Sequence, residues 1–325
     1  MQTPVTRRAA LGAGAVGGLS LMGLLEGCDS VPSTLKIGVA QPLTGNLAAL
    51  GKDLLNGVNL AVEELNKENF RIKGKPVSFE VIAVDDRANA DTGKEVAQQL
   101  VNAGVVAVIG HLNSGVSIAA APIYAEKGIA QMAISTNPKF TTLGFPTTFR
   151  LVANDNLQAK AIGSFSSTHF TSTRYAVLDD GTPYGKDLAA GASAELKKAK
   201  KEIVHQQSFD DKTKEFDELA AKLKATQTEV IVSTLNDFQV LALLEALQKV
   251  NHTQVYLLGG DTIKTTLTLK GTGMIRGLMA TSPILEAQEF PTGAAFLDKY
   301  RAKFKVDPAY GGHYTYDAMH VLAAA

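Results

Sequence analysis

The chain has 325 residues, 45% of them hydrophobic, so it can bury a large core and is long enough for two domains. Lys and Arg together number 32, as do Asp and Glu, and this balance excludes the strongly basic surface of a nucleic-acid-binding or polybasic membrane-binding protein. We therefore expect a small-molecule ligand and no nucleic-acid partner.

The amino terminus has the pattern of an export signal. Arg7 and Arg8 precede an uncharged stretch, residues 9–25, that is too short and too rich in glycine for a permanent membrane span. Residues 6–11 (TRRAAL) resemble the twin-arginine export motif. We predict that residues 1–28 are an export signal peptide and that the mature protein is periplasmic.

The chain has one cysteine, Cys28, which excludes an internal disulfide and a zinc cluster of paired cysteines. Residues 25–28 (LEGC) resemble a bacterial lipobox, although Glu26 is unusual there. This predicts a lipid anchor at Cys28, the alternative being an unused thiol in a discarded peptide. Asp29 then resembles the signal that retains lipoproteins on the inner membrane.

Strands and helices alternate from Leu35 onward. The apolar patterns predict strands at 35–40, 77–84, 105–109 and after 128, with helices at 51–66, 91–102 and 114–128. After Phe149-Arg150-Leu151 the alternation restarts, with a helix from 154, strands at 175–178, 203–207, 230–233, 255–258 and 277–281, and helices at 186–200, 213–224, 238–249, 291–304 and from 310. Such alternation is typical of parallel sheets covered by helices on both faces.

The two arrays predict two α/β lobes, residues 35–152 and 153–280, with residues 281–325 returning to the first lobe. By this prediction the chain stops within a helix, so the first lobe is incomplete at its carboxyl end. Two lobes that present their strand ends to a shared cleft are typical of a hinge-closing binding protein.

Two hydroxyl side chains mark the central strand–helix–strand unit. Ser114 lies at the predicted start of a helix, where free N–H groups and the helix dipole favour an anion. Thr136 follows the next strand, at the sheet edge where open α/β sheets bind ligands. The alternative for Ser114 is that it serves only as a helix cap.

Several motifs taken together resemble the leucine/isoleucine/valine-binding protein family, the extracytoplasmic solute receptors of branched-chain amino-acid ABC importers. They are Asp85-Asp86, residues 105–114, Thr136-Asn137-Pro138, residues 180–185 (DGTPYG) and Tyr316-Asp317-Ala318. The resemblance implies a monomeric type I periplasmic binding protein that traps a free amino acid between its lobes and delivers it to a membrane permease.

The resemblance also implies the ligand contacts of the first lobe. Ser114, with the backbone around Asn113, and Thr136, with the backbone near Ile134 and Ser135, are expected to hold the α-carboxylate and part of the ammonium.

In the second lobe, Asp261 matches the acidic position that pairs with the ammonium, and Tyr184 matches a tyrosine that closes over the ligand. The alternatives are a helix cap for Asp261 and a turn tyrosine resting on its own surface for Tyr184.

The side-chain pocket departs from the family pattern. Leu50 and Leu235 stand where the branched-chain amino-acid receptors have aromatic residues, and Asn113 replaces a smaller residue. These changes leave the choice of amino acid open, and Asn236 and Asp237 near the cleft favour a polar ligand.

The remaining polar residues are interpreted as structural, and no cofactor or metal is expected. His111 has no cysteine or acidic residue at metal-ligand spacing, so packing is the favoured interpretation, although it could line the cleft. The spacing of His313 and His320 does not suit a helical metal pair, and the stripe of Tyr310, Tyr314 and Asp317 is interpreted as core contact.

No P-loop, dinucleotide-binding or nucleophile-elbow motif occurs, so an enzyme is not predicted. Two alternatives stay open: a ligand sensor of the same fold that binds an amide or small carboxylate, and an exported enzyme that uses the same cleft.

Overall fold

The computed structural model describes residues 31–325, and these contain two five-stranded sheets and one short hairpin. The predicted signal peptide, Cys28 and Asp29 lie outside the described residues. Within residues 31–325, no helix is both long enough and apolar enough to cross a membrane.

The first sheet is parallel throughout, with the strand order β4-β1-β5-β6-β7. Its strands are β1 (Thr34–Gln41), β4 (Ser78–Asp85), β5 (Ala107–Gly110), β6 (Ala130–Ala133) and β7 (Thr148–Arg150). Its helices are α1 (Ala48–Lys67), α2 (Ala90–Asn102) and α3 (Ser114–Glu126). The hairpin of β2 (Arg71–Ile72) and β3 (Lys75–Pro76) and the short 3₁₀ helix η1 (Pro138–Thr142) were not predicted.

The second sheet is also parallel, with the order β12-β11-β10-β8-β9. Its strands are β8 (Arg174–Asp179), β9 (Glu202–Ser208), β10 (Val230–Thr234), β11 (Tyr256–Gly259) and β12 (Gly277–Ala280). The helices are α4 (Asp155–His169), α5 (Pro183–Lys198), α6 (Asp217–Ala225) and α7 (Asp237–Lys249), with the 3₁₀ helices η2 (Asp261–Ile263) and η3 (Thr268–Gly271).

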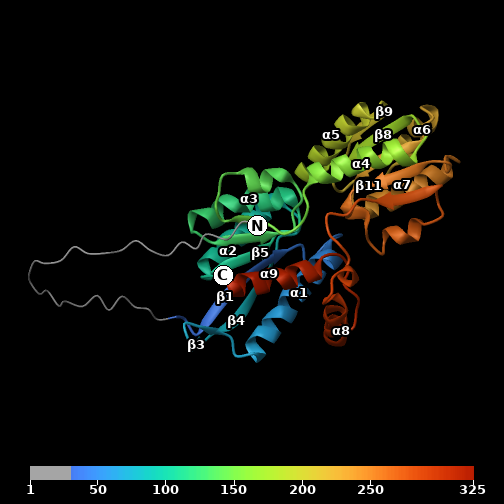
Figure 1. Ribbon diagram of the computed structural model, residues 1–325. Helices are drawn as coiled ribbons and strands as arrows, with labels where there is room; N and C mark the ends of the chain where they lie inside the picture. The colour runs from blue at the N-terminus through green and yellow to red at the C-terminus, as the bar shows by residue number, and fades with distance from the viewer. Residues whose placement is uncertain (1–30) are drawn as a thin grey trace, which may run out of the picture. The chain divides into compact units, whose positions relative to one another are not determined.

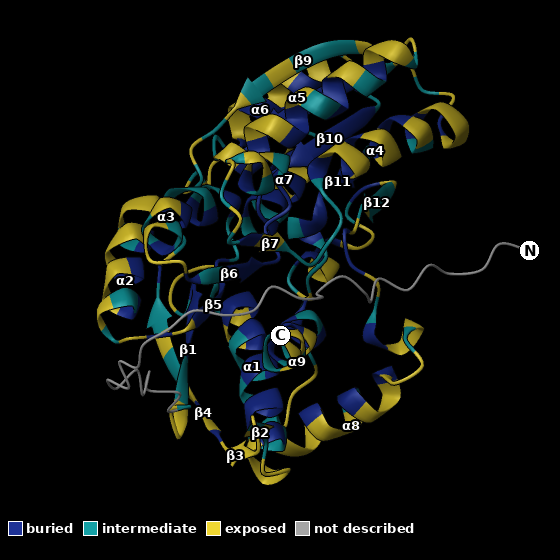
Figure 2. Cartoon of the chain, turned by 60° about the vertical axis from the view of Figure 1, so that its left-hand side comes forward, coloured by how far each residue is buried: buried dark blue, intermediate teal, exposed yellow. Residues whose placement is uncertain are grey.

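Alternate residues of the central strands fill cores on opposite faces of each sheet. On β1, Val39 packs with residues of α1 and α9, whereas Ala40 packs with residues of α2 and α3. On β8, Val177 packs toward α5, and Leu178 toward α6 and α7. This period of two buries the central strands of both sheets between helices, while the edge strands β4, β9 and β12 stay partly exposed (Figure 2).

The last part of the chain returns to the first sheet through η4 (Ala287–Glu289), α8 (Gly293–Phe304) and α9 (Gly312–Ala324). The red helix α9 runs beside α1 (Figure 1), and the Thr315 hydroxyl donates to the Leu54 carbonyl at 2.7 Å. We call the first sheet with α1–α3, α8 and α9 the first lobe, and the second sheet with α4–α7 the second lobe. The predicted α/β architecture of two parallel sheets flanked by helices is confirmed, while the residue boundaries of the lobes stay a prediction.

Several helices begin a few residues away from the predicted start, and hydrogen bonds explain the difference for α5, α6 and α9. Helix α5 starts at Pro183 because Thr182 caps it, accepting a hydrogen bond from the Gly185 amide at 3.1 Å. Helix α6 starts only at Asp217, after a turn in which the Thr213 amide donates to the Asp210 carbonyl.

Helix α9 starts at Gly312 rather than at Tyr310. The buried carboxylate of Asp53 accepts hydrogen bonds from the amides of Tyr310, Gly311 and Gly312, which holds Tyr310 and Gly311 in a bend before the helix. Tyr310 therefore belongs to a loop and does not share a helical stripe with Tyr314 and Asp317.

Candidate ligand-binding site

A cavity of about 50 Å³ lies where loops of the two lobes meet. With one exception, Tyr310, the residues that line it follow the carboxyl ends of β1, β5, β6, β8, β10 and β11, the edge at which open α/β sheets bind ligands. They are Leu47, Leu50, Leu112, Asn113, Ser114, Gly115, Ile134, Thr136, Asp180, Thr182, Tyr184, Asn236, Asp261, Thr262 and Tyr310. A space this small holds only water molecules, so the loops that surround it must part to admit a larger ligand.

The first lobe contributes the amino-terminal end of α3. Asn113 is the N-cap residue, and the amides of Ser114 and Gly115 donate to no acceptor within residues 31–325. The Ser114 hydroxyl oxygen accepts a hydrogen bond from the Asn137 amide at 3.2 Å and makes no capping bond, so the capping interpretation of Ser114 is wrong. Two free N–H groups and a hydroxyl thus form an edge whose chemistry suits an anion.

The loop after β6 supplies the second part of this edge. Ile134 and Thr136 line the cavity, and the Thr136 carbonyl accepts a hydrogen bond from the Asp155 amide at 2.9 Å. The side chain of Ser135 instead points into a buried network, 2.5 Å from the Ser117 hydroxyl, and does not line the cavity. Any role of Ser135 in binding would have to come from its backbone.

His111 is completely buried and does not line the cavity, so the packing interpretation is confirmed. Its Nδ1 lies 2.7 Å from a carboxylate oxygen of Asp86, and its Nε2 lies 3.3 Å from the Tyr124 hydroxyl. The acidic partner was missed because Asp86 follows a different strand, β4.

The second lobe contributes a buried carboxylate, that of Asp261, whose side chain is only 6% exposed. Oδ1 accepts hydrogen bonds from the Tyr184 hydroxyl at 2.9 Å and the Gln158 amide at 2.8 Å, and Oδ2 accepts one from the Tyr310 hydroxyl at 2.6 Å. Asp261 caps no helix, so that alternative is wrong. In the described part of the chain no basic side chain pairs with it, and a carboxylate held by neutral donors alone favours a cation.

Tyr184 and Tyr310 hold this carboxylate from opposite lobes. Tyr184 lies on the first turn of α5 and is buried, which contradicts the interpretation of a tyrosine resting on the surface. Burial, and then the negative charge of Asp261, raise the pKa of both hydroxyls far above the usual range, so both stay protonated donors. Tyr310 was wrongly interpreted as core contact; the Gly311-Gly312 pair after it was the sequence signal for a loop.

A second carboxylate lies behind Asp261, that of Asp155 at the start of α4. Gln158 joins the two, because its Nε2 donates to Asp155 at 3.0 Å and to Asp261 at 2.8 Å. Burial, and then the negative charge of Asp261, raise the pKa of Asp155 to about 7. Thr281, just after β12, donates to the Gln158 Oε1 at 2.8 Å, which ties this network to the chain that connects the lobes.

A third carboxylate, that of Asp180, lines the cavity itself and is 3% exposed. Its Oδ1 accepts hydrogen bonds from the Thr182 amide at 3.0 Å and hydroxyl at 2.6 Å, while its Oδ2 has only the Asn236 amide group at 3.3 Å. Burial raises the pKa of Asp180 to about 6, with the neighbouring charges of Asp179 and Asp211 adding to the effect.

The positions at which the sequence departs from the family pattern do not all lie at the cavity. Leu50 lines it beside Leu47 and Leu112, but Leu235 is completely buried in the core of the second lobe. The next residue, Asn236, lines the cavity instead. Asp237 does not line it, because its carboxylate accepts hydrogen bonds from the Thr265 hydroxyl and the Phe238 amide.

The lobes touch each other beside the cavity. The side-chain amide of Asn137 in the first lobe donates to the Pro183 carbonyl at 2.9 Å and to the Asp187 carboxylate at 2.8 Å in the second. A Cβ atom added to Gly115 would lie 3.0 Å from two ring carbons of Pro183. Helices α3 and α5 therefore meet end to end across the site.

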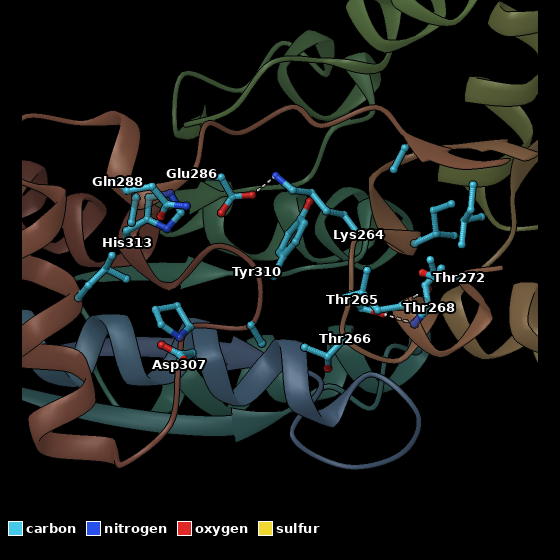
Figure 3. Close-up of a pocket in the computed structure, with 18 of the residues that line it drawn as sticks. Lys264, Thr265, Thr266, Thr268, Thr272, Glu286, Gln288, Asp307, Tyr310 and His313 are labelled. Carbon is cyan, nitrogen blue, oxygen red and sulfur yellow. Dashed lines mark hydrogen bonds and ion pairs between the residues drawn. The ribbon is translucent and has the colours of Figure 1, made fainter.

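A larger hollow of about 490 Å³ shares Tyr310 with this cavity (Figure 3). Its charged side chains pair with one another. Lys264 pairs with Glu286, as Figure 3 shows, and Arg301 pairs with Asp307. The Nε2 of His313 lies 2.9 Å from the Leu285 carbonyl, and no group of three His, Cys, Asp or Glu side chains in residues 31–325 is arranged to hold a metal ion.

The structure thus brings six of the predicted site residues to one cavity: Asn113, Ser114, Ile134, Thr136, Tyr184 and Asp261. It adds Tyr310 and Asp180, brings Asn236, which was expected near the cleft, to the same cavity, and places Ser135 outside.

Comparisons with known proteins agree with this architecture. A family model described as periplasmic binding protein matches residues 34–325. The Leu/Ile/Val-binding protein homolog 2 of Brucella abortus is 35% identical over 198 residues, which cover 61% of this chain and 53% of that protein. The chain thus spans about half the length of the curated relatives it matches.

Solved structures show the same fold. The branched-chain amino acid transporter substrate binding protein LivJ from Streptococcus pneumoniae, in complex with isoleucine, superposes with a TM-score of 0.80 at 25% identity, over 90% of this chain and 83% of that one. A solute binding protein from R. palustris in complex with benzoate superposes with a TM-score of 0.78 at 19% identity, over 90% of this chain and 80% of that one. With nearly all described residues matched, and with relatives named for leucine, isoleucine and valine, the chain belongs to the periplasmic binding protein family, as its sequence motifs predict.

Proposed function

We propose that this protein is the extracytoplasmic receptor of an ABC importer, which binds a free amino acid between its lobes and delivers it to a membrane permease. One observation carries the proposal: a free helix N-terminus and a buried carboxylate without a basic partner line the same cavity. An α-amino acid presents a carboxylate and an ammonium on one carbon, so it complements both groups at once.

In this proposal the ligand's orientation follows from the two kinds of polar group. The α-carboxylate accepts hydrogen bonds from the amides of Ser114 and Gly115 and from the hydroxyls of Ser114 and Thr136, next to the backbone of residues 113 and 134–135. The ammonium donates to Asp261, which Tyr184 and Tyr310 hold in place. Each charged group of the ligand thus replaces its water by a fixed protein partner.

The mechanism is a shift of population between open and closed arrangements. A ligand that contacts α3 from the first lobe and Asp261 from the second stabilises the closed arrangement by its differential affinity for it. The closed receptor then presents both lobes to the permease.

The family implies a periplasmic location. We propose export by the twin-arginine route, for which Arg7 and Arg8 are the signal, and a lipid anchor at Cys28 retained at the inner membrane by Asp29. We further propose a monomer that has no enzymatic activity, in keeping with relatives that are solute-binding proteins.

The chemistry of the cavity favours an amino acid over an aromatic acid such as the benzoate of the R. palustris protein. Among residues 31–325 no Lys, Arg or His lines the cavity, while Asp180 and Asp261 do. A ligand with a carboxylate but no ammonium would leave both buried carboxylates without a cation and would be repelled by them.

The first test is thermal unfolding of residues 31–325 with each common amino acid and with benzoate. A ligand at about 100 times its dissociation constant adds about 2.7 kcal/mol of stability, so binding raises the melting temperature visibly. We expect a rise with at least one amino acid. A rise with benzoate and with none of the amino acids would overturn the proposal.

The second test compares two aspartates of the second lobe that are equally buried, at 6% exposure each. Asp261→Ala removes the partner of the ammonium and is expected to weaken binding by about 2–5 kcal/mol. Asp237→Ala, at a carboxylate that does not line the cavity, is the matched control. Equal affinity of the two variants by calorimetry would remove Asp261 from the site.

A further inference from the structure

We propose that the bound amino acid carries a side chain that ends in a hydrogen-bond donor, an ammonium or an amide, and that Asp180 and Asn113 receive it. This inference rests on the function proposed above and names the chemistry of the ligand's other end. It differs from what the relatives' names suggest, since leucine, isoleucine and valine have no polar atom in their side chains.

The first observation is a carboxylate oxygen with spare capacity. Asp180 lines the cavity and is nearly completely buried, and no basic side chain in the described residues pairs with it. Both hydrogen bonds from Thr182 go to Oδ1, so Oδ2 keeps one long contact of 3.3 Å, to Asn236. A carboxylate oxygen accepts two hydrogen bonds, and Oδ2 therefore has room for a further donor.

The second observation is an unpartnered acceptor from the opposite lobe. Asn113 also lines the cavity, and its Oδ1 is buried without a hydrogen-bond partner. Most buried side-chain acceptors are hydrogen-bonded, so such an oxygen at a ligand cavity calls for a donor from the ligand. Asn113 in the first lobe and Asp180 in the second thus each have an acceptor oxygen that can take a hydrogen bond from the ligand.

Charge balance leads to the same conclusion. The ligand's carboxylate is met by the N-terminus of α3 and its ammonium by Asp261, which leaves Asp180 as a buried charge without compensation. An aliphatic side chain would exclude water from Asp180 and Asn113 and would offer neither a partner. A terminal ammonium compensates Asp180 fully, and a terminal amide supplies donors to both oxygens.

The apolar residues of the cavity are compatible with such a ligand. Leu47, Leu50 and Leu112 line it next to Asn113. The methylene groups between the α-carbon and a terminal ammonium or amide are themselves apolar and can pack on these leucines. The leucines therefore favour an apolar methylene chain in the ligand, and the polar atoms favour a hydrogen-bond donor at the end of that chain.

The test is calorimetric titration with amino acids that match in shape and differ in the terminal group. Diaminobutyrate is paired with norvaline, ornithine with norleucine, and asparagine with leucine. We expect the donor-bearing member of at least one pair to bind about tenfold tighter or better, since a site with polar groups rejects an analogue that leaves them unpaired.

The outcomes separate this inference from the function on which it rests. If the aliphatic member binds as tightly or tighter in every pair, while Asp261→Ala weakens that binding, the receptor stands and the inference is overturned. If no amino acid binds to the folded protein, both fall.

Variants locate the preference. Asp180→Asn and Asn113→Ala should each reduce the ratio of affinities within the preferred pair by about tenfold. The control is Asp179→Asn, at a neighbouring carboxylate that accepts hydrogen bonds from the Gly181 amide and Ser208 and does not line the cavity. Asp180 also supports the start of α5, so circular dichroism is needed to show that the Asp180→Asn variant is folded. Asn113→Ala tests the preference for a donor-bearing ligand independently, from the other lobe. An unchanged ratio in both variants contradicts the assignment.

Discussion

The two walls of the cavity differ in charge. In the described residues the first-lobe wall has no acidic or basic side chain; its polar groups are the amides and hydroxyls at the start of α3 and after β6, the side chain of Asn113 and the hydroxyl of Tyr310. The second-lobe wall has two buried carboxylates, Asp180 and Asp261, that have no basic partner among the described residues. In the proposed function, the free amides of the first lobe meet the ligand's carboxylate and the carboxylates of the second lobe meet its cationic groups, so closing of the lobes would also orient the ligand.

The polar groups at the ends of β5 and β11 differ with the element that comes after each strand. After β5 the chain enters a long helix directly, so free amides face the site. After β11 it enters only a short 3₁₀ helix, so the side chain of Asp261 is the main polar group. This rule does not extend to Asp180, which follows β8 and precedes the long helix α5, so its charge comes from the residue type alone.

The largest expected effect concerns Tyr310, the residue of the first lobe that touches the acidic wall. Asp53 holds its loop by accepting three amide hydrogen bonds and one from the Tyr300 hydroxyl. We expect Asp53→Ala to lower the free energy of unfolding by about 3–5 kcal/mol, because four buried donors lose their acceptor. Denaturant titration measures the loss, and Asp298→Ala, at an exposed carboxylate of α8, should have no comparable effect.

The second prediction concerns the carboxylate behind the acidic wall. The pKa of Asp155 is about 7 in the folded chain, above its value when unfolded, so the folded chain binds more protons between about pH 4 and 7. Stability contributed by the protonated form is present below about pH 4 and is lost as pH rises through 7.

Asp155→Asn removes this titration and should therefore raise the stability at pH 8 relative to the unsubstituted protein by a few kcal/mol, on the order of the pKa shift. Denaturant titrations from pH 4 to 8 measure it. Parallel stability curves for the two proteins would show that Asp155 does not titrate in this range.

The third prediction breaks the contact between the walls. Asn137→Ala removes two hydrogen bonds to the second lobe and is expected to weaken ligand binding by about 1–3 kcal/mol without any contact to the ligand. Asp187→Ala removes the partner of one of them. A double-mutant cycle should show coupling between the two positions, and additive effects would mean that the contact does not govern closure.

The smallest effect is expected on the neutral wall. Ser114→Ala removes one hydroxyl donor to the ligand carboxylate but leaves both free amides of α3, so we expect a loss of affinity of about 1–2 kcal/mol. Ser117→Ala on the same helix is the control, because Ser117 is buried beside Ser135 and does not line the cavity. A larger loss for Ser117 than for Ser114 would place the anion elsewhere.

The sequence predicted the parts of this site that depend on local order. Ser114, Thr136 and Asp261 each follow a strand of a parallel sheet, and the alternation of strands and helices shows where such strands end. Alternation is robust because it follows from periods of two and 3.6 residues that hold over whole elements.

The parts that depend on distant contacts were not predictable. Tyr310 reaches Asp261 only because Asp53, far away in the sequence, holds its loop. The error at Leu235 has another cause. Leu235 was predicted to line the pocket, but its side chain lies in the core and that of the next residue, Asn236, lines the cavity. Neighbouring residues after a strand point to opposite sides, so an alignment error of one position is enough to produce this difference.

The absence of a side chain at Gly115 sets how far the two lobes can approach. Even a methyl group there would lie 3.0 Å from two ring carbons of Pro183, so one of the two helix ends would have to shift by a few tenths of an ångström. A larger residue would destabilise the closed arrangement of the lobes relative to the open one. Part of the ligand's binding free energy would then be used to overcome this strain. Substitutions of increasing size at position 115 should therefore lower the ligand affinity in steps, without any contact to the ligand. Such a series would give receptors that respond over different ranges of ligand concentration.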